Sequence, residues 1–315
     1  MKVIRNFLWC TLITVSAQAY IYEIRVVRGW DETQARYQYL IGLSDFHDKI
    51  DAANKTQMDT LKAAFTQCCS RDPKIIVEDI SSKGSQGRMC CGNFFVESHG
   101  GILGGLTEIC KSCGVKDVDN IEYRYCRVTS LGPIINNLNG SLDSFPSSKA
   151  ITIGSLLEEI DMFIAELTTF AQGGIVNNYY KTSVAQLFQE IAALQLRDHK
   201  EMSVADYIAT HEKDAGRLAL IRKLLTFDST LLDVKMLHML ATCVGKDTVI
   251  AVAGGAHIGR VWDVLEQAGY ERVYATNIKM MKETDPAKCV GCTMTDKNCC
   301  LKPEPIDISP INQFI

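Results

Sequence analysis

The clearest pattern in the chain is a short apolar run that ends in small residues and a histidine. Residues 249–253 are apolar, Gly254 and Gly255 follow them, and His257 stands where the spacing of apolar residues becomes helical. This pattern predicts a buried strand that leads through a tight turn into a helix. Ligands bind at the carboxyl ends of strands in open α/β sheets, which makes His257 a candidate site residue.

A second segment with the same shape occurs more than 200 residues earlier. Residues 39–44 predict a strand, and His47 follows it between two aspartates. Residues 55–68 have helical spacing, and the apolar run at 74–77 predicts a second strand that ends in two carboxylates, the first of which is Glu78. A strand, a helix and a strand in this order predict a right-handed parallel crossover.

The rest of the chain adds more helices than strands. Residues 121–128 alternate and predict a strand with Arg124 and Arg127 on opposite faces, so that at most one of them points into a common pocket. Residues 30–37 predict a turn with a short helix. Residues 151–227 are mostly helical, residues 231–243 and 258–267 predict further helices, and residues 272–276 predict the last strand.

These elements predict an α/β fold. The expected core is a central mixed or mostly parallel sheet flanked by helices, with a helical insertion inside a single domain. We expect that domain over residues 20–280, with a first half at 20–130, the insertion at 150–228 and a second half at 229–280. Residues 281–315 form a polar, Cys-rich tail that we expect to wrap the surface, pinned by disulfides.

The N-terminus has the features of a signal peptide over residues 1–19. Lys2 and Arg5 precede a short apolar core, and Ala17 and Ala19 form a small-residue cleavage site. We therefore expect export to a periplasm or the extracellular space, with no membrane span after cleavage. Loss of the leader takes the formal charge from −4 to −6, which argues against nucleic acid and anionic membranes as partners.

The cysteines favour disulfides over a structural zinc. There are 13 in the chain and 12 after the leader, and an even number in an exported chain indicates disulfide pairing. Two pairs, Cys110/Cys113 and Cys289/Cys292, have zinc-ligand spacing, but no pair of histidines completes either site. The pairing itself cannot be assigned from the sequence.

Three residues carry the expected chemistry. His257 at a helix N-terminus is expected to be neutral, and a neutral imidazole can ligate a metal or act as a general base. His47 and Glu78 could complete a metal site or activate a water, and Gly254 and Gly255 let the backbone approach a cofactor closely. The structural alternatives are a phosphate-type turn at His257, a solvated acidic turn at His47 and a helix cap or surface charge at Glu78.

The order of these motifs resembles the superfamily that includes TraB/Tiki, ChaN and erythromycin esterase. Gly254 to His257 matches one of the two G-x-x-H motifs, and Ser44 to His47 matches the other with Ser44 in place of glycine. The resemblance implies a sheet built from two related halves, with Glu78 as the strand-end acid and Arg124 or Arg127 as the arginine. Its members include metal-dependent proteases, an esterase and a haem-binding lipoprotein.

Two functions follow as hypotheses. The first is an exported, metal-assisted hydrolase of peptide or ester bonds, acting on a small molecule or a peptide. His47, Glu78 and His257 would hold a divalent metal or the attacking water, with Arg124 holding the substrate. The second is an inactive, disulfide-rich binding or interaction protein on the same fold, for which haem is one candidate ligand. Ser44 in the first motif favours the second hypothesis. No serine-hydrolase, nucleotide-binding or zincin motif is present.

Overall fold

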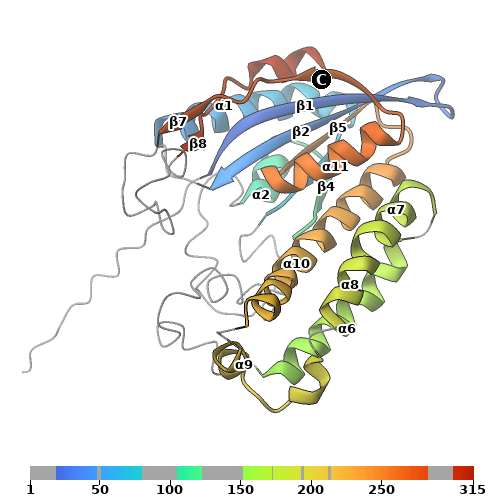
Figure 1. Ribbon diagram of the computed structural model, residues 1–315. Helices are drawn as coiled ribbons and strands as arrows, with labels where there is room; N and C mark the ends of the chain where they lie inside the picture. The colour runs from blue at the N-terminus through green and yellow to red at the C-terminus, as the bar shows by residue number, and fades with distance from the viewer. Residues whose placement is uncertain are drawn as a thin grey trace, which may run out of the picture.

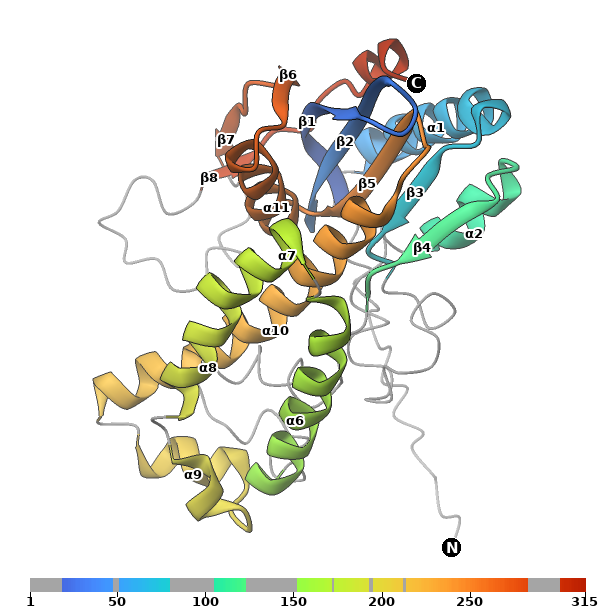
Figure 2. The ribbon, with the colours of Figure 1, turned by 90° about the vertical axis from the view of Figure 1, so that its right-hand side faces the viewer.

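A six-stranded sheet lies between two layers of helices in the computed structural model (Figure 1, Figure 2). The structure describes residues 19–47, 51–79, 105–122, 152–171, 173–192, 195–211, 214–282 and 301–315. This arrangement confirms the predicted α/β fold with a mixed, mostly parallel sheet flanked by helices.

The sheet has the strand order β4-β3-β5-β2-β1-β6. Five of these strands run in the same direction, and β1 is antiparallel to both of its neighbours. The strands are β1 (Ala19–Asp31), β2 (Arg36–His47), β3 (Lys74–Val77), β4 (Asp117–Asn120), β5 (Thr248–Gly254) and β6 (Glu271–Ala275).

The central strand β5 is buried on both of its faces. Val249, Ala251 and Ala253 pack toward α11 (Gly255–Gln267) and the inserted helices, whereas Ile250 and Val252 pack toward α1 (Asp51–Cys68) and α2 (Leu106–Ser112). A strand that is covered by helices on both faces needs apolar residues at every position. For this reason β5 is a continuous apolar run in the sequence rather than an alternating one.

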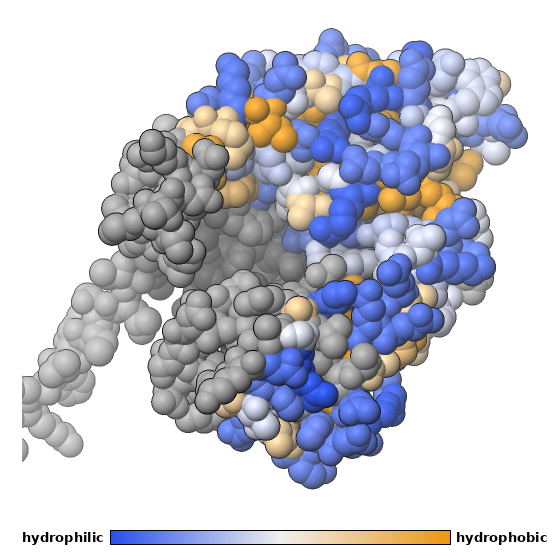
Figure 3. All heavy atoms as spheres, viewed as in Figure 1, coloured by the Kyte–Doolittle hydropathy of each residue, from blue (hydrophilic) through white to orange (hydrophobic). Residues whose placement is uncertain are grey.

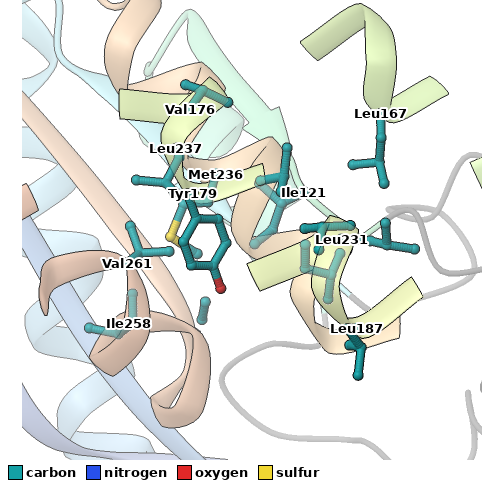
Figure 4. Close-up of a cluster of buried hydrophobic side chains, with 14 of the residues drawn as sticks. Ile121, Leu167, Val176, Tyr179, Leu187, Leu231, Met236, Leu237, Ile258 and Val261 are labelled. Atoms are coloured by element: carbon teal, nitrogen blue, oxygen red, sulfur yellow. The ribbon is translucent and has the colours of Figure 1, made fainter. Parts of the chain in front are cut away.

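A long helical insertion lies between β4 and β5 in the chain, packs against α11 through α7 and α10, and extends away from the sheet (Figure 2). Figure 4 shows Tyr179, Met236 and Ile258 meeting in the core between the insertion and α11. The boundary that we expected at residue 229 falls inside α10, which runs without a break from the insertion toward the sheet. The elements are α6 (Ile153–Phe170), α7 (Gly174–Tyr179), a π-helical turn η4 (Tyr180–Val184), α8 (Ala185–Ala192), the 3₁₀ helix η5 (Leu196–His199), α9 (Val204–Thr210) and α10 (Ala215–Thr242).

The C-terminal segment is part of the core on the α1 face, which corrects the expectation of a surface wrap. Ile308, Ile311 and Ile315 are at most 5% exposed and pack against β1, β2 and α1. The Gln57 side chain on α1 hydrogen-bonds the backbone of both Ile21 and Ile306. The elements here are β7 (Met280–Lys282), β8 (Leu301–Pro303) and the 3₁₀ helix η7 (Ser309–Gln313).

The predicted turn within residues 30–37 is present, but it closes a β-hairpin and contains no short helix, and Trp30 and Tyr37 face each other across β1 and β2 with their rings 5.1 Å apart. Most of the strand predicted at residues 121–128 lies outside the described residues. The structure contains a strand that was not predicted, β4 at Asp117–Asn120, where Asp117 and Asp119 form ion pairs with Lys74 on β3. Charge pairing across an edge strand leaves no apolar alternation in the sequence.

Candidate functional site

The carboxyl ends of β2, β5 and β3 lie side by side at one edge of the sheet. Asp45 of β2 is paired with Gly254 of β5, and the backbone N–H of Glu78 donates to the carbonyl of Val252 at 2.9 Å. The sequence predictions for His47, Glu78 and His257 therefore fall on three adjacent strand ends. The backbone of His47 ends β2, and its side chain lies outside the described part of the structure.

His257 is oriented by a buried carboxylate. It lies in the first turn of α11 and is 6% exposed, and its Nδ1 is 2.7 Å from Oδ1 of Asp233, which is fully buried on α10. A carboxylate accepts hydrogen bonds, so the proton of a neutral imidazole lies on Nδ1 in this arrangement. Nε2 is then the basic nitrogen, available to a proton or a ligand.

Asp233 also accepts hydrogen bonds from two neighbouring side chains. The Tyr179 hydroxyl donates to Oδ2 at 2.9 Å, and Nε of Arg260 donates to the same oxygen at 2.6 Å. Burial and the Asp233 charge raise the pKa of the Tyr179 phenol far above its usual value. Burial alone would lower the pKa of Arg260, but the hydrogen bond and charge of Asp233 outweigh it and raise that pKa. Asp233 is thus surrounded by hydrogen-bond donors from three side chains, His257, Tyr179 and Arg260.

Glu78 and His257 approach each other across Gly254. Glu78 is 2% exposed, and its Oε2 accepts a hydrogen bond of 2.7 Å from the backbone N–H of Gly254. A Cβ at Gly254 would lie 3.3 Å from Oε2 of Glu78 and 3.6 Å from Cδ2 of His257. The absence of a side chain at this position therefore keeps the space between the acid and the imidazole open.

Gly255 has a packing reason of its own. A Cβ there would lie only 1.8 Å from the hydroxyl oxygen of Tyr22 on β1, so the Tyr22 side chain rests against the turn. Burial, followed by the charge of Glu23, raises the pKa of the Tyr22 phenol. The cofactor-binding role expected of Gly254 and Gly255 remains a prediction, and the contact with Tyr22 is by itself enough to require glycine at position 255.

The end of β2 contains a different network. Ser44, at the position of the missing glycine, is fully buried and donates to Oε2 of Glu23 at 2.9 Å. Nε of Arg25 donates to the other oxygen of Glu23 at 2.7 Å, and NH1 of Arg25 donates to Asp263 on α11 at 2.8 Å. Ser44 therefore belongs to a polar network that connects β2, β1 and α11.

The neighbouring polar residues at the ends of β3 and β4 have structural roles. Both carboxylate oxygens of Asp79 accept backbone N–H groups at the start of α2, from Gly105 at 3.0 Å and from Thr107 at 2.9 Å. Lys235 is 5% exposed on α10, and its Nζ donates to the carbonyl of Asn120 at 2.9 Å. The helix cap considered for the carboxylates after β3 is thus found at Asp79, and not at Glu78.

A groove of about 990 Å³, lined by both polar and apolar side chains, borders the Asp233 cluster on the side of Arg260. It lies between the α7–α8 segment and the second half of α11, and Figure 3 shows mostly hydrophilic side chains on the described surface over α8. Glu78 and His257 do not line it. Its polar lining comprises Asn178, Thr182, Ser183, Gln186, Glu190, Thr230, Arg260, Asp263 and Gln267.

The predicted metal site is only partly described by the structure, and the predicted arginines are not described at all. Within the described residues, no group of three or more His, Cys, Asp or Glu side chains is arranged to hold a metal ion. Glu78 and His257 supply two donors, and any third from His47 lies outside the described side chains. Arg124 and Arg127 lie outside the described residues altogether. No helix in the described part of the chain is long and apolar enough to cross a membrane.

Three residues of this cluster were not anticipated from the sequence. Asp233 interrupts an apolar stretch of α10, which is an unusual place for a charge and was a usable signal. Arg260 lies one helical turn after His257, and i,i+3 residues share a face of a helix. Tyr179 carried no recognisable signal, because it reads as part of the apolar stripe of the insertion.

Comparisons with known proteins give no relative for this chain. No family model, no curated protein and no solved structure matches it.

Proposed function

We propose that the chain is a hydrolase whose active site is formed by Glu78, His257 and Asp233. The observation that carries the proposal is the approach of a buried glutamate to a carboxylate-oriented histidine at the carboxyl edge of a parallel sheet. Ligand sites of open α/β folds lie at this edge. The motif resemblance supports the same reaction class, with peptide or ester bonds as substrates.

Each of these side chains has a separate role in the proposed reaction. Nε2 of His257 takes a proton from the attacking water, and Asp233 stabilises the imidazolium that forms while it fixes the ring orientation. One oxygen of Glu78 is held by the Gly254 N–H, and the other positions the water. Arg260 is in contact with Asp233 and also lines the groove, where the remainder of a small-molecule or peptide substrate would lie.

A divalent metal is part of the proposal, because the donor chemistry fits one. A metal-binding histidine commonly donates a hydrogen bond from its second ring N–H to a carboxylate, and Nδ1 of His257 is placed to do so toward Asp233. With a metal bound, Nε2 of His257, the second oxygen of Glu78 and the side chain of His47 would hold the ion, and Nε2 would then be a ligand instead of the proton acceptor that it is in the metal-free site. When bound, such a metal supplies Lewis-acid chemistry and lowers the pKa of a bound water.

Hydrolysis of ester and peptide libraries by the purified chain tests the proposal. We expect wild type to turn over at least one substrate, and His257→Ala and Glu78→Gln to lose about 10²–10⁴-fold in rate. His238→Gln is the matched control, since His238 stacks on Phe170 within α10 and α6, away from Asp233. Absence of turnover, or turnover that survives His257→Ala in a folded variant, would refute the hydrolase.

Metal analysis separates the metal from the hydrolase. We expect about one equivalent of a divalent metal in the purified chain and its loss in His47→Ala. Hydrolysis that depends on His257 in a metal-free protein would keep the hydrolase and reject the metal. Export is tested independently, by sequencing the N-terminus of the chain made in its own host, where cleavage after Ala19 is expected.

The second candidate is a binding protein that has lost the chemistry. It is favoured by Ser44, which stands in place of the motif's glycine and is hydrogen-bonded to Glu23. Haem is the ligand that the motif resemblance suggests. A visible absorption band that appears on adding haem and disappears in His257→Ala, without any hydrolysis, would support this candidate.

A further inference from the structure

The ends of α1 and α2 bring four cysteines together from two separate parts of the chain. Cys68 ends α1 and Cys69 begins the 3₁₀ helix η1, while Cys110 lies in α2 and Cys113 follows it directly. All four belong to the core on the α1 face of the sheet, with Cys68 and Cys110 at its centre and the other two packed against it. We propose that they form two disulfides, Cys68–Cys110 and Cys69–Cys113.

The pairing follows from matched burial and from proximity. Cys68 is 1% exposed and Cys110 is fully buried, whereas Cys69 and Cys113 are both half-buried. A Cβ at Gly114 would stand 3.8 Å from Sγ of Cys69, which places Cys69 beside the backbone that follows Cys113. Cys110 and Cys113 lie three residues apart at the end of α2, which is in contact with α1, and Cys68 and Cys69 belong to the same core cluster.

The bonds would supply what α2 lacks at its C-terminal end. The helix has seven residues, too few for independent stability in water, and buries only Leu106 and Cys110. Its N-terminal end is held by Asp79, which accepts N–H groups from Gly105 and Thr107. Two disulfides would tie its other end to α1.

The chemistry is thiol–disulfide exchange with a small-molecule or protein disulfide. That oxidant takes two electrons from each cysteine pair and leaves as two thiols, which carry the two protons that the cysteines lose. Burial raises the pKa of Cys68 to about 11 and that of Cys110 to about 12, so the folded core holds few thiolates. We therefore expect the bonds to form during folding. The same high pKa values argue against a redox-catalytic Cys-x2-Cys motif.

The structure as described contains these cysteines as free thiols, and they form no group arranged to hold a metal ion within the described residues. Bound zinc is an outcome that the test must distinguish from the disulfides. Cys243, also free, lies at the end of α10 and takes no part in the cluster. It provides a control thiol whose pKa burial likewise raises, to about 11.

Peptide mapping of the full chain tests the pairing directly. The chain is folded with a glutathione disulfide buffer, its free thiols are alkylated, and it is cut without reduction by trypsin and a glutamate-specific protease. These enzymes place Cys110 in residues 109–111, Cys113 in residues 112–116, and both Cys68 and Cys69 in residues 63–71. We expect all three peptides in one linked species.

Single variants resolve the two bonds. In Cys68→Ser, residues 63–71 should be linked only to residues 112–116, and in Cys69→Ser only to residues 109–111. Cys243→Ser should leave the wild-type map unchanged. Four alkylated cysteines in the wild-type map, a link from any of the four to another cysteine, or one equivalent of zinc released by thiol modification would each overturn the proposal.

Discussion

The two histidine-bearing strand ends look alike in the sequence and are built differently. At the end of β5, Gly254 leaves space between Glu78 and His257, and a carboxylate from α10 orients the imidazole. At the end of β2, Ser44 fills the corresponding position and hydrogen-bonds Glu23. At the end of β5 a glycine lies between two buried ionisable side chains, and at the end of β2 a buried serine belongs to a polar network.

The glycine two residues before Ser44 explains part of this difference. A Cβ at Gly42 would lie 2.8 Å from Ile258 and 2.9 Å from Trp262, so Gly42 lets α11 pack closely on β2. This glycine serves the packing of the helix that carries His257. The β2 end therefore provides the close packing of α11, whereas the β5 end carries the candidate site residues Glu78 and His257.

The largest effect is expected from Asp233, on which the β5 end depends. Asp233→Ala leaves His257, Arg260 and Tyr179 without their common acceptor, and loss of one partner from a buried charged cluster costs about 3–5 kcal/mol. Asp233→Asn keeps the shape but favours the wrong tautomer, and on the proposed mechanism should lower the rate up to about 10⁴-fold. Denaturant unfolding and steady-state kinetics measure the two effects.

The matched variant at the β2 end is Glu23→Gln, whose amide oxygen still accepts from Arg25 and whose amide NH2 can donate to the Ser44 hydroxyl oxygen. It should be destabilised by less than Asp233→Ala and should retain most of the turnover. Equal losses of turnover in Glu23→Gln and Asp233→Asn would mean that the two strand ends are equivalent parts of one site, contrary to the comparison.

A pair of glycine substitutions should separate packing from chemistry. Gly42→Ala forces a methyl group against Ile258 and Trp262, and such overpacking typically costs about 1–3 kcal/mol. Gly254→Ala meets Glu78 and His257 at longer distances, so the free energy of unfolding should change by less than about 1 kcal/mol while turnover falls. Thermal unfolding and kinetics on both variants check this. A Gly254→Ala enzyme with full turnover would show that the space is not used.

Replacing Ser44 by the glycine of the G-x-x-H motif is a third test of the difference between the β2 and β5 ends. Ser44→Gly removes the hydrogen bond to Glu23 and adds backbone freedom within a strand, at an expected cost of about 1–2 kcal/mol. We expect no gain in turnover, because the serine is part of the support. A rise in turnover would instead indicate that Ser44 had impaired a second catalytic motif.

The fold was predictable because its central strands are marked by burial on both faces. The short apolar runs at β5 and β3 indicate buried strands. The helix between β2 and β3 follows from the helical spacing of its apolar residues. Edge strand β4 was not predicted, because its acidic residues pair with Lys74 and leave no apolar period. The tail was misjudged because its buried isoleucines are separated by polar residues.

The candidate site was only partly predictable, for a physical reason. Strand ends are fixed by local sequence, so Glu78 and His257 could be placed at one edge from their neighbours alone. Asp233 comes from a helix more than 20 residues away, and its contact with His257 depends on how α10 packs against α11. Tertiary packing of this kind leaves no short motif behind.

The smallest effect on stability is expected at the amino edge of the sheet. This edge carries charged residues but no proposed catalytic residue, so it serves as a control region. Lys74, at the start of β3, is paired with Asp117 and Asp119 at the start of β4, and Lys246 also pairs with Asp117. Burial alone would raise the pKa of Asp117, but the hydrogen bonds from Lys74 and Lys246 outweigh it and lower that pKa. Lys74→Met should cost about 1 kcal/mol at neutral pH, since the aspartates are partly exposed and screened.

The sign of the pH dependence follows from the direction of that shift. A depressed pKa in the folded state gives Asp117 a stabilising contribution that is fully present above its unfolded pKa of about 3.9 and is lost as the pH falls through the folded pKa. The stability difference between wild type and Lys74→Met should therefore be constant from about pH 5 to pH 9 and shrink below about pH 4. Urea unfolding at a series of pH values measures it, with turnover unchanged at neutral pH. If Lys74→Met folds normally but loses turnover, then the charge at the amino edge of the sheet affects the activity of Glu78 and His257. The two edges would then not be functionally separate.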